Sequence, residues 1–160
     1  MKLNLGSGNR MLKGYINVDN YCPADQKVDL SSFPWPWPDN SIEEVVAWDF
    51  LEHLKEFKMA WQEIYRILKP SGRAWIRVPH FRCPEAHWPE VHFHYFSIVT
   101  FQHLTKECWY APNVRYKTVS LRHWFGPKMK ILTPFANIWP LFWDWLGLPV
   151  SKVEWIGEKT

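Results

Sequence analysis

The 160-residue chain lacks the features that mark several common classes of protein. No apolar stretch approaches the roughly 18 residues that a membrane-spanning helix needs, so we expect no membrane span. No run of basic residues is present, and a formal net charge of +3 is too small to indicate a nucleic-acid partner. The sequence also shows no internal repeat and no low-complexity tract.

Cysteine is scarce, and the three cysteines present, Cys22, Cys83 and Cys108, have no regular spacing. An odd number without a pattern argues against a disulfide framework and against a zinc site built from cysteine pairs. We therefore predict a reducing, cytoplasmic location. We also expect no signal peptide, because Met1 and Lys2 lead straight into an apolar segment.

Hydrophobic residues, by contrast, make up 47% of the chain, and 12 of them are tryptophans. This length and composition predict one domain over residues 1–160 with a substantial core. We interpret the surplus of tryptophan as core filling together with the lining of an aromatic cleft.

The clearest structural pattern is a strand, a helix and a second strand. Residues 44–47 are expected to form a buried strand, and apolar side chains then recur at helical spacing from Leu51 until Pro70. Residues 73–79 alternate as a strand does. A strand, helix and strand in so short a stretch predict a parallel sheet.

The rest of the chain predicts further elements around this unit. We expect short strands over residues 3–5 and 15–19, joined by a connection that is too short for the usual helical crossover of about a dozen residues. A proline-rich loop over residues 33–40 either walls a cleft or is pinned to the surface by Phe33 and Trp35. After residue 96 we expect a helix over 97–106, a strand over 113–124, a helix over 135–146 interrupted by Pro140, and a last strand over 150–156.

The first two strands end in residues that suggest a nucleoside site. Gly6, Ser7 and Gly8 follow the first strand, and glycines let backbone N–H groups approach a ligand. Asp19 ends the second strand and could accept both hydroxyls of a ribose. A plain turn between strands is the alternative interpretation of the glycines alone.

Several further stretches follow in an order and spacing typical of one family. The stretches are LNLGSGN at 3–9, NVDN at 17–20, DL at 29–30, the run from Trp37 to Leu54, and EIYRILKPSGRAWIRVPH at 63–80. On these residues the chain resembles the class I S-adenosylmethionine (SAM)-dependent methyltransferases, in particular the small type 11-like branch.

The resemblance implies an α/β fold, a Rossmann-like, mostly parallel sheet flanked by helices and abbreviated at the N-terminus. It implies SAM as cofactor, bound at the carboxyl ends of the strands. Carried over by position, the cofactor-binding residues would be Leu5, Gly6, Ser7, Gly8, Asp19, Asn20, Asp29, Leu30, Trp48, Asp49 and Phe50. Two positions depart from the family pattern, because Asn4 stands where many relatives carry an acid and Asn9 replaces a glycine.

Two histidines are candidate catalytic bases. His53 follows the strand at 44–47, and His80 follows the strand at 73–79, so both are expected near the ligand edge of the sheet. A structural hydrogen bond to the backbone is the alternative role for each. Trp48 or Phe50 could place an aromatic face beside the sulfonium.

A second group of histidines, His87, His92 and His94, lies close in sequence to Glu85 and Glu90. This spacing could suit a metal ion. We favour a substrate lid or a structural role, and we assign no metal ligands.

The sequence therefore predicts a methyltransferase that acts on a small-molecule or saccharide acceptor. A non-catalytic relative used for binding or assembly is the alternative, suggested by the short first connection and by Asn4. A nicotinamide-dependent oxidoreductase is disfavoured, because the glycine turn lacks a third glycine and a helix N-terminus to hold a pyrophosphate.

Overall fold

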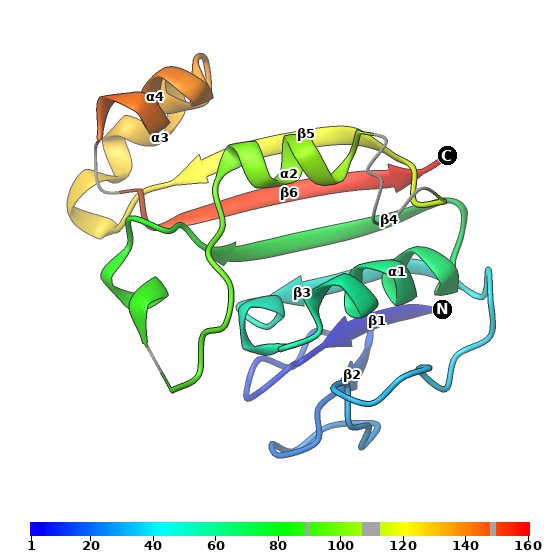
Figure 1. Ribbon diagram of the computed structural model, residues 1–160. Helices are drawn as coiled ribbons and strands as arrows, with labels where there is room; N and C mark the ends of the chain where they lie inside the picture. The colour runs from blue at the N-terminus through cyan, green and yellow to red at the C-terminus, as the bar shows by residue number, and fades with distance from the viewer. Residues whose placement is uncertain (89, 107–112, 148–149) are drawn as a thin grey trace.

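The computed structural model describes residues 1–88, 90–106, 113–147 and 150–160, which form a six-stranded sheet in the order β2-β1-β3-β4-β6-β5 (Figure 1). The strands are β1 (Lys2–Leu5), β2 (Ile16–Val18), β3 (Ile42–Trp48), β4 (Leu68–Pro79), β5 (Tyr116–Trp124) and β6 (Lys152–Lys159). The first four strands pair in parallel, and β6 runs antiparallel to both of its neighbours. The predicted Rossmann-like, mostly parallel sheet is confirmed.

The connection between β1 and β2 contains no helix, as its length predicted. It is held instead by two buried asparagines. Asn4 Nδ2 donates to the Arg10 carbonyl at 2.8 Å and to Asn17 Oδ1 at 2.9 Å, and the backbone N–H of Leu12 donates to the same oxygen at 2.7 Å. Asn4 therefore organises the connection rather than facing a ligand, which gives its departure from the family pattern a structural reason.

The central unit runs from β3 through a 3-10 turn, η1 (Leu51–His53), and helix α1 (Phe57–Ile67) into β4. The expectation of one helix starting at Leu51 was wrong, because Leu54 adopts an extended conformation and separates η1 from α1. Burial of Leu51 and Leu54, three residues apart, suits a 3-10 turn as well as a helix. The strand predicted to begin at Arg73 was also too short, because β4 begins at Leu68.

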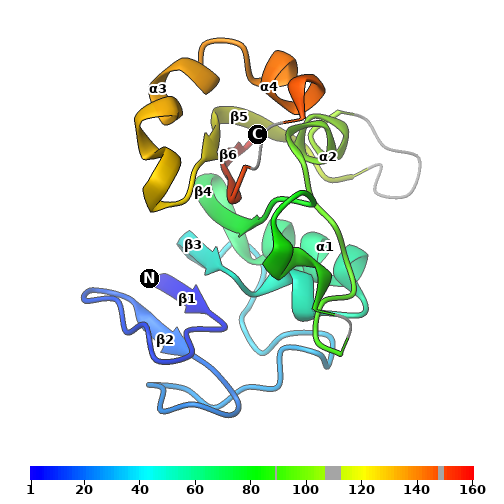
Figure 2. The same cartoon turned by 90° about the vertical axis from the view of Figure 1, so that its left-hand side faces the viewer.

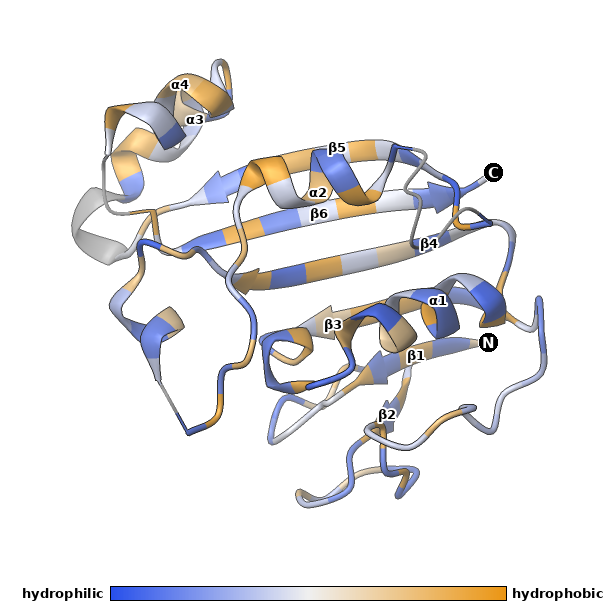
Figure 3. Ribbon diagram, viewed as in Figure 1, coloured by the Kyte–Doolittle hydropathy of each residue, from blue (hydrophilic) through white to orange (hydrophobic). Residues whose placement is uncertain are grey.

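Helix α1 and helix α2 (Ile98–Leu104) lie on one face of the sheet (Figure 2). Along β4 the side chains of Ala74, Ile76 and Val78 are buried, whereas Arg73 is exposed and the residues between are partly exposed. Hydrophobic and hydrophilic residues accordingly alternate along this strand (Figure 3). Helices thus cover one face of the described sheet, and the other face carries charged side chains together with the packed rings of Trp48 and Trp75.

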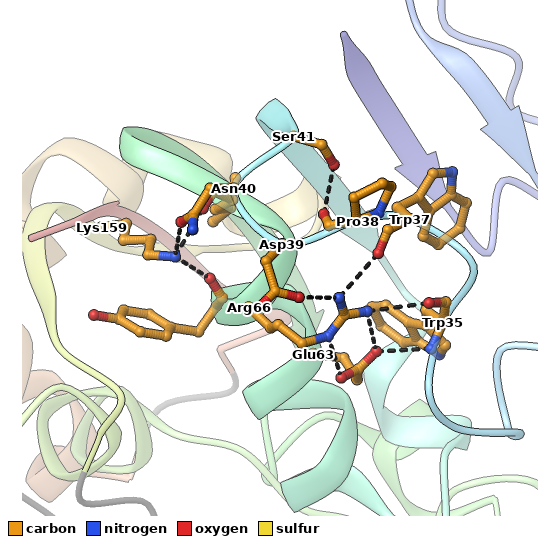
Figure 4. Close-up of polar contacts among 11 residues, drawn as sticks. Trp35, Trp37, Pro38, Asp39, Asn40, Ser41, Glu63, Arg66 and Lys159 are labelled. Carbon is orange, nitrogen blue, oxygen red and sulfur yellow. Dashed lines mark hydrogen bonds and ion pairs between the residues drawn. The ribbon is translucent and has the colours of Figure 1, made fainter.

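The proline-rich loop packs onto α1 through Arg66 (Figure 4). The Arg66 guanidinium donates to the carbonyls of Trp35 and Trp37 at 3.0 and 2.9 Å, and to Asp39 at 2.6 Å. It also pairs with Glu63, which in turn accepts from the backbone N–H of Trp35 at 2.7 Å. Both tryptophans are buried, whereas Pro34, Pro36 and Pro38 are exposed, so the loop is pinned to the surface by its aromatic side chains rather than walling a cleft.

The C-terminal part follows the predicted order, but α2 and β5 are shorter than expected, and the last strand lies later, at Lys152–Lys159 rather than 150–156. Helix α2 buries three apolar residues as expected, and β5 contains a bulge between Thr118 and Ser120. The expected helix over 135–146 is divided into α3 (Thr133–Ala136) and α4 (Pro140–Leu146), preceded by the 3-10 helix η3 (Pro127–Leu132). A further 3-10 turn, η2 (Pro84–His87), lies between β4 and α2.

Several aromatic side chains of this C-terminal part are exposed, with Trp139 at 70% and Trp145 at 78%. None of the helices in the described ranges combines the length and apolarity that crossing a membrane would require. Cys22 and Cys83 are free thiols, and Cys108 lies outside the described residues. A single domain and a cytoplasmic location stay predictions.

Candidate functional site

A first cavity of about 430 Å³ lies where β1, β2 and β3 end. Each of these strands is followed directly by a lining residue, namely Gly6, Asp19 and Asp49. Open α/β sheets bind ligands at this edge, and the volume is in the range of small-molecule sites. The full lining is Gly6, Gly8, Asp19, Asn20, Tyr21, Val28, Asp29, Leu30, Ser31, Asp49, Phe50, His53 and Leu54.

The two glycines of the first turn are needed for different reasons. Both have a positive φ, 58° for Gly6 and 53° for Gly8. A Cβ on Gly6 would lie 2.1 Å from the ring of Phe50, whereas a Cβ on Gly8 would meet nothing within 4 Å. Gly6 thus permits close packing against Phe50, and Gly8 leaves its backbone open to the cavity.

Asp19 faces the glycine turn. Its Oδ2 accepts from the backbone N–H of Gly8 at 2.9 Å, and its Oδ1 accepts from the N–H groups of Tyr21 and Cys22, each at 2.8 Å. Burial would raise the pKa of Asp19, but these backbone hydrogen bonds outweigh it and lower the pKa. The carboxylate is thus ionised at neutral pH and keeps acceptor capacity for a ribose hydroxyl.

Asp29 is fixed at the far side of the cavity by its own turn. Its Oδ1 accepts from the backbone N–H of Ser31 at 2.9 Å and from the Ser31 hydroxyl at 2.6 Å. These hydrogen bonds lower the pKa of Asp29. Asn20 and Leu30 complete this side, as the resemblance implied that they would.

Three of the expected cofactor residues, Leu5, Ser7 and Trp48, do not line the first cavity. Leu5 is fully buried in the core, and Ser7 is also buried. The ring of Trp48 lies under the Arg77 guanidinium, 4.6 Å from its centroid. Of the two aromatic residues expected beside the sulfonium, Phe50 thus lines this cavity and Trp48 does not, and Tyr21 lines it as well.

A second cavity of about 590 Å³ shares Asp49 and His53 with the first. It is bounded by η1, by the segment after β4 and by the ends of β5 and β6. Its other lining residues are Glu52, Arg77, Pro79, Cys83, Glu85, Trp88, His92, Trp124, Phe125, Gly126, Ser151 and Lys152. The shared wall means that two ligands, one in each cavity, would meet beside Asp49 and His53.

Asp49 carries the charge at this junction. It has a φ of 55°, which is uncommon outside glycine, and its Oδ2 lies 2.6 Å from Lys152 Nζ. Arg10 and Arg77 each approach the same oxygen at 3.6 Å. Asp49 thus ties the tip of β3 to β6 and to the first turn.

Glu52 is the most perturbed group in the second cavity. Its side chain is 1% exposed, and neither carboxylate oxygen has a hydrogen-bond partner. Burial, together with the charge of Asp49, raises the pKa of Glu52 to about 8. Burial likewise lowers the pKa of His92, and the nearby His53 adds to this effect.

The two predicted catalytic histidines have different environments. His53 borders both cavities, and its Nδ1 donates to the Val91 carbonyl at 2.8 Å, which leaves Nε2 as an acceptor in the neutral ring. His80 lines neither cavity. It is fully buried, and its Nε2 lies 2.9 Å from Asp144 Oδ1.

The histidines that seemed clustered in sequence are separated in space. His87 donates to the Phe81 carbonyl at 2.6 Å and His94 to the Lys55 carbonyl at 3.0 Å, whereas His92 joins Glu52 and His53. Sequence reasoning missed Glu52 because its only local signal was its position next to His53. It also missed Lys152, which reaches the site from the other end of the chain.

Comparisons with known proteins agree with this geometry. Residues 17–76 match the family described as "Methyltransferase domain", and no curated protein sequence matches the chain. A solved SAM-dependent methyltransferase from Archaeoglobus fulgidus has a TM-score of 0.67 at 14% identity, with 99% of this chain and 85% of that chain covered. One from Mesorhizobium loti has a TM-score of 0.64 at 10% identity, with 99% and 90% covered. One from Methanosarcina mazei has a TM-score of 0.61 at 15% identity, with 99% and 91% covered.

The fold shared with these structures and the matched domain confirm the resemblance that the sequence predicted.

Proposed function

We propose that this chain, with its methyltransferase domain and class I fold, binds SAM in the first cavity and methylates a small molecule held in the second. The observation that carries the proposal is the shared wall of the two cavities at Asp49 and His53. A methyl donor and its acceptor must meet in line, and holding both in place supplies much of the rate of such a transfer.

The residues around the first cavity suit the parts of SAM. Gly8 leaves backbone open to the cavity, and the ionised Asp19 beside it suits ribose hydroxyls. The Phe50 ring would favour a sulfonium by about 0.5–2 kcal/mol. When bound, SAM supplies an electrophilic methyl group on that sulfonium.

The second cavity provides for the acceptor. Trp88, Trp124 and Phe125 supply aromatic surface, which suits a saccharide or another small ring compound. Glu52, His53 and His92 bring acceptor atoms to the wall shared with the first cavity, where they can orient or deprotonate a hydroxyl or an amine. We propose no catalytic role for His80, because it is buried against Asp144 away from both cavities.

Titration calorimetry with S-adenosylhomocysteine tests the cofactor half of this proposal. The wild-type chain should bind one molecule per chain, and Asp19→Ala should weaken binding by about tenfold or more through loss of hydrogen bonds to the ribose. Glu56→Ala is the matched control, since this exposed carboxylate borders neither cavity. Equal affinity of the two variants would contradict the assigned site.

A transfer assay with labelled SAM tests the other half. Label should appear in an acceptor drawn from hydroxylated metabolites and saccharides, and Asp19→Ala should reduce its appearance. A non-catalytic binding protein is not favoured, because two cavities meeting at one polar wall are what a transfer reaction requires. Binding of S-adenosylhomocysteine without transfer to any acceptor would favour that alternative.

A further inference from the structure

Glu52, His53 and His92 form a compact group at the shared wall of the two cavities. One ligand atom from each lies within 4.8 Å of the others. Glu52 and His53 are held by η1, and His92 comes from the segment between η2 and α2. Glu52 and His53 are adjacent in the sequence, whereas His92 is distant from both. The fold of the segment that carries His92 therefore completes the group.

The group contains more buried acceptor atoms than donors. Both carboxylate oxygens of Glu52, Nδ1 of His92 and Oδ1 of the neighbouring Asp49 are buried without a hydrogen-bond partner. Unpaired buried acceptors are unfavourable, and an isolated carboxylate is the most unfavourable of them. A cation placed among Glu52, His53 and His92 would compensate the Glu52 carboxylate and accept a lone pair from each imidazole.

The nearby side-chain cations do not supply that charge. Lys152 Nζ is bound to the other carboxylate oxygen of Asp49 at 2.6 Å. The Arg77 guanidinium lies over the ring of Trp48 and approaches the same Asp49 oxygen at 3.6 Å. Both cations are thus directed to Asp49 Oδ2, and Glu52 is left without a partner.

The orientation of His53 is one that metal ligands commonly have. Its Nδ1 donates to the Val91 carbonyl at 2.8 Å, so Nε2 carries the free lone pair of the neutral ring. A histidine that binds a metal usually donates its second ring nitrogen to a carbonyl or carboxylate in this way. The hydrogen bond fixes both the tautomer and the direction of the ring.

We propose that Glu52, His53 and His92 bind one divalent transition-metal ion, such as Zn²⁺ or Mn²⁺, at the wall where the two cavities meet. Two imidazoles and one carboxylate are a known ligand set for such ions, and they leave coordination positions open. All three residues line the second cavity. An acceptor oxygen would fill one of the open coordination positions, a step that rests on the proposed function. This requirement narrows the acceptors to molecules with a metal-binding hydroxyl or carboxylate.

The second histidine–carboxylate group of the described residues differs in this respect. His80 Nε2 and His123 Nε2 each lie within 3.0 Å of Asp144 Oδ1, and all three groups lie away from both cavities. The carboxylate oxygen Oδ1 of Asp144 thus already lies against two imidazole nitrogens, although Asp144 Oδ2 and His123 Nδ1 have no hydrogen-bond partner. We therefore interpret this group as the anchor of α4 to the sheet.

Titration calorimetry of the chelator-treated and dialysed chain with zinc chloride, and separately with manganese chloride, tests the proposal. Wild-type protein should bind one Zn²⁺ per chain with a dissociation constant below about 10 µM. Glu52→Gln and His92→Ala should each weaken binding by about 100-fold or more, since each removes one of three ligands. His94→Ala is the matched control, because His94 donates to the Lys55 carbonyl and is not part of the group.

Two further measurements keep the test decisive. The visible spectrum of the Co²⁺-loaded wild-type chain should show the bands of nitrogen and oxygen coordination, and this readout does not depend on whether a variant folds. S-adenosylhomocysteine binding on the same samples separates the two proposals, since loss of that binding alone contradicts only the proposed function. No Zn²⁺ binding by the wild-type chain, or equal loss in His94→Ala, would overturn the metal site and leave the group as a proton acceptor.

Discussion

Replacing Glu52 by Gln should stabilise the metal-free chain at high pH and leave it unchanged at low pH. The carboxyl is buried without a hydrogen-bond partner, and burial raises its pKa from an ordinary 4.5 to about 8. Between these two values the unfolded chain releases a proton that the folded chain retains. The free energy of unfolding of the wild-type chain therefore falls as the pH rises through this window.

The size of the effect follows from the width of the window. Each unit of pKa difference is worth about 1.4 kcal/mol, so a shift from 4.5 to about 8 corresponds to at most about 5 kcal/mol. Glutamine has the shape of the protonated acid and does not titrate. The variant should thus match the wild type near pH 4.5 and exceed its stability by about 3–5 kcal/mol above pH 8, or by about 10 °C in melting temperature.

Urea denaturation of both chains from pH 4.5 to pH 9 in the presence of a chelator checks this prediction. The chelator is needed because a bound metal ion would compensate the charge of Glu52. Glu56→Gln is the control, since Glu56 is exposed. A difference between wild type and Glu52→Gln that does not change with pH would refute the reasoning.

The other predictions concern different parts of the chain. Gly6→Ala should weaken S-adenosylhomocysteine binding by about tenfold and destabilise the fold by about 2–3 kcal/mol, because the new Cβ would lie 2.1 Å from Phe50 at a φ of 58°; unchanged calorimetry and melting would contradict this. Arg66→Met should lower the free energy of unfolding by about 2–4 kcal/mol in urea, because it leaves the buried carboxylate of Glu63 unpaired, and equal urea midpoints would disprove it. Asp144→Asn should destabilise the chain at pH 7 by about 1–3 kcal/mol, because burial raises the pKa of Asp144 but hydrogen bonds from two buried histidines outweigh it and lower the pKa. This loss of stability should shrink below pH 4, and a loss that is constant from pH 3 to pH 7 would count against the prediction.

The elements that the sequence predicted well are those with a strong local pattern. The strands β1 and β2, the parallel unit around α1, and α2 follow from apolar spacing and from the turn residues between them. The start of α1 could not be predicted, because the buried Leu51 and Leu54 fit a helix and a 3-10 turn equally well.

The candidate site divides in the same way. Gly6, Gly8 and Asp19 follow directly from strand ends, and neighbouring strand ends lie at one edge of a sheet. The second cavity was not predictable, since it joins η1 to Lys152 and to His92 through pairings between distant segments. Local spacing grouped His92 with His87 and His94, whereas the fold separates them.

The central claim is that the first cavity binds the nucleoside part of SAM between the glycine turn and Asp19. Calorimetric titration of the wild-type chain with S-adenosylhomocysteine tests it most directly, with Asp19→Ala measured alongside. The account predicts one site per chain with a dissociation constant of about 1–100 µM, and at least about tenfold weaker binding by the variant. No binding by a folded wild-type chain at millimolar ligand, or binding that Asp19→Ala leaves unchanged, would contradict it.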